Sequence, residues 1–362
     1  STIMPREKLM TNAVGFISMI IGGLLNDKYG PRWVMFVGGL MFGLGMFACG
    51  FAKSVGNLTF WYGIVLGLGL SFVYGCTISN TIKFFPDKRG MVGGMTTAFY
   101  GISSVIFAPL ADALSNAFGA RATFKILGIV FLVIICVGAF IMQKCPAGFV
   151  PTGYVAPVAA GKKANDKTPV EMLKMPIFYV MLLMLTCGGT FGMMIISQAK
   201  GIAINMVNAA PATATLFVSV LCLFNTAGRL VAGSLSDKLG RINTLTIALV
   251  VALVGLAALL GASLTGAMTL FAVGVVLIGI CFGTFMGVFP GFCTDQFGQK
   301  NNTVNYGIMW IGFCLAGIVG PTILTKVHNA TGTYTMAFVI SLCIAVAGLV
   351  LTFVYRATSK KN

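Results

Sequence analysis

A series of long apolar stretches restricts the fold of this chain more than any other feature. A membrane-spanning helix needs about 20 predominantly apolar residues, and a window of that length finds eleven candidates. They lie near residues 9–26, 33–52, 58–82, 91–111, 124–142, 176–197, 212–236, 243–264, 268–291, 302–325 and 334–355. Charged residues make up only 9% of the chain, against about 25% in soluble domains. We therefore predict an all-α membrane protein and exclude a soluble enzyme.

The basic residues indicate how the chain is oriented. There are 24 Lys and Arg against 8 Asp and Glu, a net charge of +16. Alternating the loops between the two sides of the membrane puts sixteen of the basic residues on one side and seven on the other, with Arg229 inside a span. The richer side, which includes the C-terminal tail, should be cytoplasmic. The charge is thus explained by topology, and we expect no nucleic-acid partner.

Cysteine and histidine are too dispersed for metal chemistry. The ten cysteines form no C-x-x-C pair, and His328 is the single histidine. Neither a disulfide framework nor a zinc site fits this spacing. A membrane enzyme would need clustered His, Cys or acidic residues at one depth, so we expect no metal, no cofactor and no enzymatic activity.

The longest connection divides the chain into two parts. Residues 143–175 are rich in Pro, Gly, Ala and Lys, which indicates a flexible cytoplasmic linker. The predicted domains are an N-terminal helix bundle over 1–142 and a C-terminal bundle over 176–362. Within the linker, Thr168 and Glu171 fit a capping box with Pro169 in the first turn of a short helix.

A short motif occurs once in each part of the chain, at the predicted cytoplasmic end of a span. Its form is G-x-x-x-D-K-x-G followed by an arginine. The motif residues are Gly23, Asp27, Lys28, Gly30 and Arg32 in the first copy, and Gly233, Asp237, Lys238, Gly240 and Arg241 in the second. The first glycine would let the helix end approach a neighbour, and the aspartate could face the positive N-terminus of another helix.

This motif resembles the loop motif of the major facilitator superfamily, found between helices 2 and 3 and between helices 8 and 9. The resemblance implies two pseudo-symmetric bundles of six helices, with the motifs helping to close the cytoplasmic side. The first copy follows the first predicted span, whereas the second copy follows the second span of its bundle. The visible spans would then be helices 2–12, with helix 1 missing.

Arg229 is the basic residue that lies inside an apolar span. It stands eight residues before Asp237, which places it roughly 12 Å from that motif along a helix. An arginine at such depth costs about 2.5–3.5 kcal/mol on insertion and commonly marks a substrate pathway. Its donors suit a carboxylate, and Asn225, one turn earlier, could orient it. The alternative is a structural arginine satisfied by carbonyls or by an internal acid.

A narrower resemblance, to the oxalate/formate antiporter family, covers about residues 22–325. It is carried by the run FPDKRG over 85–90, by Asn225 and Arg229, and by the run NYG over 305–307 followed by Trp310. The resemblance implies that Arg229 binds a substrate carboxylate. It also implies an aromatic pocket formed by Tyr74, Tyr100, Phe282 and Trp310.

The chain departs from that family at two pocket positions. Phe313 stands where a second cation, a lysine, helps to hold the oxalate dianion, and Met286 replaces a tyrosine. A second negative charge would lack a partner in a low dielectric. We therefore predict a secondary transporter for a monocarboxylate such as lactate, pyruvate or formate.

Several alternatives stay open at this point. They are an oxalate/formate exchanger, an anion channel and a membrane sensor. Asp112 lies near an outer helix end, so a carried proton has no evident acidic site and coupling could be to a proton or a counter-anion. Beyond the substrate and the lipid bilayer we expect no partner, and we expect a monomer in a prokaryotic inner membrane.

Overall fold

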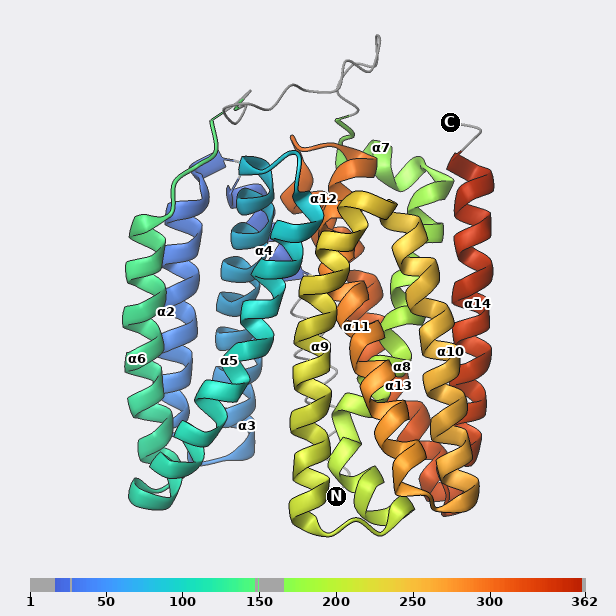
Figure 1. Ribbon diagram of the computed structural model, residues 1–362. Helices are drawn as coiled ribbons and strands as arrows, with labels where there is room; N and C mark the ends of the chain where they lie inside the picture. Colours follow the sequence, from blue (N-terminus) through green and yellow to red (C-terminus); the bar gives the residue numbers. More distant parts are fainter. Residues whose placement is uncertain (1–16, 27, 147–148, 150–165, 360–362) are drawn as a thin grey trace. The chain divides into compact units, whose positions relative to one another are not determined.

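The computed structural model describes residues 17–26, 28–146, 149 and 166–359, with the backbone alone of Ser104, Val105 and Ala108. Every regular element in this part of the chain is a helix (Figure 1). Nine of the described helices are long and apolar enough to cross a membrane. The prediction of an all-helical, multi-pass integral membrane protein is confirmed.

Two of the eleven predicted spans are not among these nine helices. The described part of the first span forms the shorter apolar helix Ile17–Asn26. The fourth lies within α5 (Arg89–Phe118), which has 30 residues and in which Ser104, Val105 and Ala108 are described by their backbone alone. The count of eleven spans stays a prediction.

The chain groups into two compact units by packing. The first unit comprises Ser1–Asp87, Ser103–Met172 and Cys293–Trp310. The second comprises Lys88–Ile102, Leu173–Phe292 and Ile311–Asn362. Helices α5 and α11 therefore contribute to both units. The predicted division into two bundles joined by 143–175 stays a prediction.

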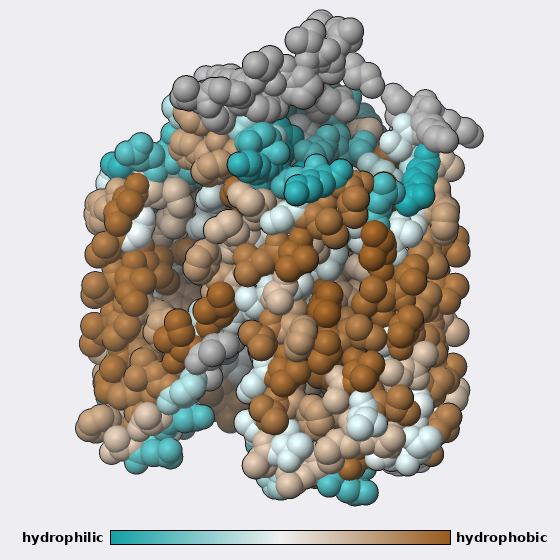
Figure 2. Space-filling view, in the orientation of Figure 1, coloured by the Kyte–Doolittle hydropathy of each residue, from teal (hydrophilic) through white to brown (hydrophobic). Residues whose placement is uncertain are grey.

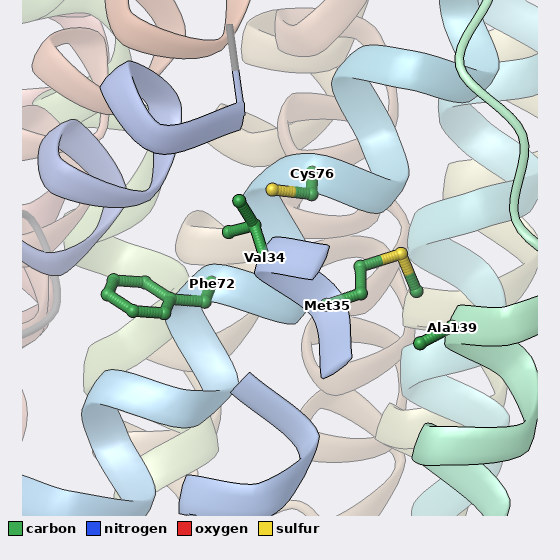
Figure 3. Packing of buried hydrophobic residues seen from close by; sticks show 5 residues of the cluster. All are labelled: Val34, Met35, Phe72, Cys76 and Ala139. Carbon is green, nitrogen blue, oxygen red and sulfur yellow. The ribbon is translucent and has the colours of Figure 1, made fainter. Parts of the chain in front are cut away.

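The first unit is built around α2. Its helices are α2 (Pro31–Cys49), α3 (Val55–Leu58), the π-helical turn η1 (Thr59–Leu66), α4 (Gly67–Phe84), α6 (Ala120–Ile141) and α12 (Asn302–Met309). Figure 3 shows the cluster where α2, α4 and α6 meet, formed by Val34, Met35, Phe72, Cys76 and Ala139. A Cβ on Gly69 would lie 2.5 Å from the main-chain oxygen of Gly38, so α2 and α4 touch backbone to backbone.

The second unit contains the longest helices. They are α8 (Pro176–Val207), α9 (Pro211–Leu239), α10 (Arg241–Thr265), α11 (Met268–Phe297), α13 (Ile311–Thr331) and α14 (Thr335–Ser359). Helix α8 packs against α13 and α14, and α10 packs against α14. Leu223 and Val231 of α9 are 62% and 65% exposed. Figure 2 shows such hydrophobic side chains along the helix flanks and hydrophilic ones at helix ends, as expected for contact with lipid.

The end of the linker is held in place by hydrogen bonds within the first unit. The N–H of Thr168 donates to Glu171 Oε2 at 2.7 Å, and the N–H of Glu171 donates to Thr168 Oγ1 at 3.3 Å. The predicted capping box is therefore confirmed, and it starts α7 (Pro169–Lys174). Just before it, Asp166 Oδ1 accepts the N–H groups of Gln299 and Lys300 at 2.8 and 3.0 Å. The linker thus ends on the loop between α11 and α12.

Candidate functional site

Arg229 lies at the centre of a small polar cluster in the second unit. Its Nη1 donates to the main-chain oxygen of Thr97 at 2.7 Å, and its Nε donates to Asn225 Oδ1 at 3.2 Å. Thr97 belongs to α5, whereas Asn225 lies one turn before Arg229 on α9. Both acceptors are neutral oxygens, and these two bonds fix the plane of the guanidinium. The expected orientation of Arg229 by Asn225 is thus seen as a hydrogen bond.

Glycines on two neighbouring helices hold the backbone of α9 at this level. A Cβ on Gly287 of α11 would lie 2.7 Å from the main-chain oxygen of Arg229, and one on Gly94 of α5 would lie even closer to the same atom. Gly283 of α11 meets the main-chain oxygen of Asn225 in the same way. Side chains are absent from these contacts, so α5 and α11 fix the height and rotation of Arg229 through the backbone.

The second copy of the repeated motif caps α5. Asp237 accepts hydrogen bonds from the N–H groups of Gly90 and Met91 at 2.9 and 2.8 Å. These N–H groups belong to the first turn of α5, where the helix itself provides no acceptor. Arg241 forms an ion pair with Asp237 at 2.6 Å and donates to Ser236 Oγ, also at 2.6 Å. The carboxylate therefore faces a helix N-terminus, where a negative charge is favourable.

The first copy of the motif has the same local build where the structure describes it. Gly30 and Gly240 have φ of +83° and +87° and precede α2 and α10 respectively. A Cβ on Gly23 would lie 2.9 Å from the N of Val304, so the helix Ile17–Asn26 approaches α12 closely. Arg32 Nε donates to the main-chain oxygen of Met142 at 3.4 Å. Asp27 lies outside the described residues.

The remaining basic residues of the two motifs are Lys28 and Lys238. Lys28 Nζ lies 5.2 Å from the ring centroid of Tyr29. Lys238 lies in the last turn of α9, where a positive charge suits the helix dipole.

The predicted aromatic residues are distributed over both units. In the first unit, the rings of Tyr74 and Trp310 have centroids 5.2 Å apart, and Tyr306 lies 5.5 Å from Trp310. In the second unit, Phe282 and Phe313 have centroids 6.3 Å apart. Phe282 is buried and packs on Gly192 of α8, whereas Phe313 is half-buried.

Two further positions complete the description of this region. Tyr100 is half-buried and lies one turn after Thr97 on α5. Met286 is buried on α11, beside Gly287. Of the predicted site residues, Arg229 and Asn225 are joined directly by a hydrogen bond.

Thr97 is a site residue that sequence reasoning missed. It contacts Arg229 through its main-chain oxygen, so the identity of its side chain gives no direct signal. An indirect signal is present in the small residues Gly90, Gly94 and Gly101 around it, since such spacing allows another helix to come close.

Comparisons with known proteins connect this geometry to a family. The sequence profile of the Major Facilitator Superfamily matches residues 10–321. An uncharacterised transporter of this superfamily, YhjX of Escherichia coli (strain K12), is 32% identical over 302 residues, covering 83% of this chain and 73% of the relative. The oxalate:formate antiporter of Oxalobacter formigenes is 28% identical over 336 residues, covering 92% and 78%. Human monocarboxylate transporter 11 is 24% identical over 352 residues, covering 92% and 70%.

A solved structure has the same fold. The crystal structure of the superfamily transporter FucP in its outward conformation aligns over 98% of this chain and 90% of that chain, with a TM-score of 0.70 and 13% identity. The resemblance that the repeated motif carried is therefore confirmed across most of the sequence. The chain belongs to the major facilitator superfamily of transporters.

Proposed function

We propose that the protein carries a small monocarboxylate, such as lactate, pyruvate or formate, across the membrane by alternating access. The observation that carries the proposal is the placement of Arg229 inside a long apolar helix, oriented by Thr97 and Asn225 through neutral oxygens. A guanidinium held in this way presents a planar set of donors that matches a carboxylate. The names of two relatives, an oxalate:formate antiporter and a monocarboxylate transporter, support the same class of substrate.

The proposed site includes the other predicted residues. In the second unit, Phe282, Phe313 and Tyr100 would lie beside the anion, because aromatic rings exclude water and tyrosine hydroxyls can donate hydrogen bonds. The assignment of Tyr74 and Trp310 of the first unit to substrate binding stays a prediction. Phe313 separates this proposal from the oxalate/formate exchange that one relative's name favours. With one cation in the site, one carboxylate is balanced and a second would be buried without a counter-charge.

The proposal also covers the setting of the protein in the membrane. The eleven predicted spans would form two bundles, over 1–142 and 176–362. The proposed carrier is a monomer in a prokaryotic inner membrane with a cytoplasmic C-terminus. The two motifs would help to close the cytoplasmic side, and the coupling would be to a proton or a counter-anion.

Uptake by purified protein in proteoliposomes tests the function. Arg229→Gln removes the charge and keeps some hydrogen bonding, so it should abolish uptake of labelled lactate and formate. Arg121→Gln, at the start of α6, is the control and should leave uptake unchanged. Unchanged uptake by a folded Arg229→Gln protein contradicts the proposal.

The same preparation separates a carrier from an anion channel or a sensor. A carrier's uptake rises when unlabelled substrate is placed on the far side of the membrane, because the loaded form returns faster than the empty one. A channel shows no such stimulation, and a sensor shows no uptake.

A further inference from the structure

The first unit contains a pocket that the proposed transport site does not use. Its volume is about 550 Å³, which is within the size range of small-ligand sites. The lining residues are Asn26, Pro31, Asn80, Lys83, Lys144, Cys145, Pro146, Phe149, Asp166, Gln299, Lys300 and Asn301. They come from helix ends and the segments just beyond them, on the side that the basic residues predict to be cytoplasmic.

The pocket carries a surplus of positive charge. Among the described lining residues, Lys83, Lys144 and Lys300 bring three ammonium groups, and Asp166 brings one carboxylate. The Asp166 carboxylate already accepts two main-chain N–H groups, from Gln299 and Lys300, so part of its charge is compensated by peptide dipoles. The remaining field favours an anion with more than one negative oxygen.

Asparagine side chains hold the walls in a fixed arrangement. Asn80, which is 4% exposed, donates from Nδ2 to the main-chain oxygen of Gln143 at 2.7 Å and accepts the N–H of Cys145 at Oδ1 at 3.1 Å. These two bonds bracket Lys144. Asn301, which also lines the pocket, donates from Nδ2 to the main-chain oxygen of Lys167 at 3.1 Å. Specific hydrogen bonds therefore hold the backbone next to the lysines.

One buried acceptor lies beside this charge. Asn26 is 5% exposed and its Nδ2 donates to Thr303 Oγ1 at 3.1 Å, whereas its Oδ1 has no hydrogen-bond partner among the described residues. Such an atom is costly to bury unless a ligand or water donates to it. A protonated oxygen or an ammonium group of a ligand would satisfy it.

We propose that this pocket binds a phosphate-bearing anion, either the headgroup of an anionic lipid or a free phosphate compound. The three lysines would contact the phosphate oxygens as point charges, and Phe149, Pro31 and Pro146 would line the less polar part of the ligand. The pocket is several times larger than a single carboxylate. Lysines at helix ends on the predicted cytoplasmic side lie at the level of lipid headgroups.

Cys145 supplies a reporter inside the pocket. It is half-buried, and burial raises the pKa of its thiol while the nearby positive charge of Lys83 lowers it. Because the thiolate is the reactive form, an anion that covers the pocket and offsets the Lys83 charge should slow alkylation of Cys145. Peptide mass spectrometry reads this cysteine separately from the other nine.

The test measures the rate of maleimide labelling at Cys145 in the full-length chain. One arm uses nanodiscs of phosphatidylglycerol against nanodiscs of phosphatidylcholine, and the other adds inorganic pyrophosphate to protein in phosphatidylcholine nanodiscs. We expect at least about a threefold slower rate in one arm. Slowing by phosphatidylglycerol assigns a lipid headgroup, and slowing by pyrophosphate assigns a free phosphate compound. An unchanged rate in both arms overturns the proposal.

Charge variants show whether the lysines are responsible. In the triple variant Lys83→Gln, Lys144→Gln, Lys300→Gln, the slowing should disappear. The matched control Lys88→Gln, Lys174→Gln, Lys361→Gln removes the same charge from the same predicted side, outside the pocket, and should keep it. If the pocket variant does not fold, Lys→Arg substitutions at the same three positions should keep the slowing. Equal slowing in the pocket and control variants overturns the assignment to these lysines.

Discussion

Asp237 Oδ1 accepts the main-chain N–H of Gly90 at 2.9 Å, so a side chain at the end of α9 caps the start of α5. Its second oxygen takes the next N–H, of Met91, at 2.8 Å. The Asp237 carboxylate therefore caps α5 and also forms an ion pair with Arg241. The cap and the ion pair predict different effects of substitutions at these positions.

Replacing Asp237 with Asn should destabilise the protein by about 1.5–3 kcal/mol, the value of hydrogen bonds to a charged group. The amide keeps one acceptor oxygen but loses the charge that the helix N-terminus favours. The measurement is the melting temperature in detergent. Asp112→Asn, which changes an exposed acid on α5, is the control and should leave the melting temperature unchanged.

The exchange of charges Asp237→Arg with Arg241→Asp should not restore stability. An ion pair could re-form in either order, but the N–H groups of α5 would then face a donor instead of an acceptor. Recovery of the wild-type melting temperature by the double variant would show that the ion pair alone matters and that the cap contributes nothing.

Gly283→Ala should weaken both stability and substrate binding. The new methyl group would overlap the main-chain oxygen of Asn225, and overpacking of this kind costs about 1–3 kcal/mol. The shift of α9 should also move Arg229, so the Michaelis constant for uptake should rise. Gly201→Ala in α8 is the matched control because a Cβ there meets nothing within 4 Å. Equal effects of the two substitutions would contradict the assigned contact.

Phe313→Lys should change the preferred substrate from a monocarboxylate to a dicarboxylate. A second cation would balance the second charge of oxalate, and we expect the ratio of oxalate to lactate uptake to rise at least about tenfold, equivalent to about 1.4 kcal/mol. Phe313→Gln removes the ring without adding charge and should not change the ratio in this way. The proposal that Phe313 lies near the substrate fails if the lysine variant behaves like the glutamine variant.

Asp166→Ala should loosen the loop between α11 and α12. The N–H groups of Gln299 and Lys300 would lose their acceptor, so amide hydrogen exchange should accelerate there. Thr168→Ala, which removes half of the capping box, should instead accelerate exchange at the start of α7. Identical exchange patterns in the two variants would mean that the linker end unfolds as one unit.

The sequence predicted well those features that depend on local chemistry. The capping box of Thr168 and Glu171 needs only a helix start, and the spans need only length and hydropathy. The repeated motif also has the same backbone conformation in both copies, since its last glycine takes a positive φ at Gly30 and at Gly240, a feature that was not predicted. In each of these cases a few neighbouring residues determine the structure.

Features that depend on which helices meet could not be predicted in the same way. The acceptor for Arg229 Nη1 is a main-chain oxygen of α5, and every residue carries such an atom, so Thr97 has no signature of its own. The contribution of α5 and α11 to both units could not be predicted from any single stretch of sequence, because packing between segments far apart in the chain determines it. The structure shows that two neutral oxygens, from Thr97 and Asn225, accept hydrogen bonds from Arg229, and the assignment of Arg229 to substrate binding stays a prediction.

The glycine contacts around α9 have a consequence for how this protein can diverge. In a saturation library selected for uptake, Gly94, Gly283 and Gly287 should tolerate almost no replacement, because any side chain would meet the backbone of α9. Phe313 is half-buried, and a change of its side chain can alter the ligand while the helices stay in place. New substrates would therefore be selected through changes in the residues that line the site, while the glycine contacts with α9 stay unchanged.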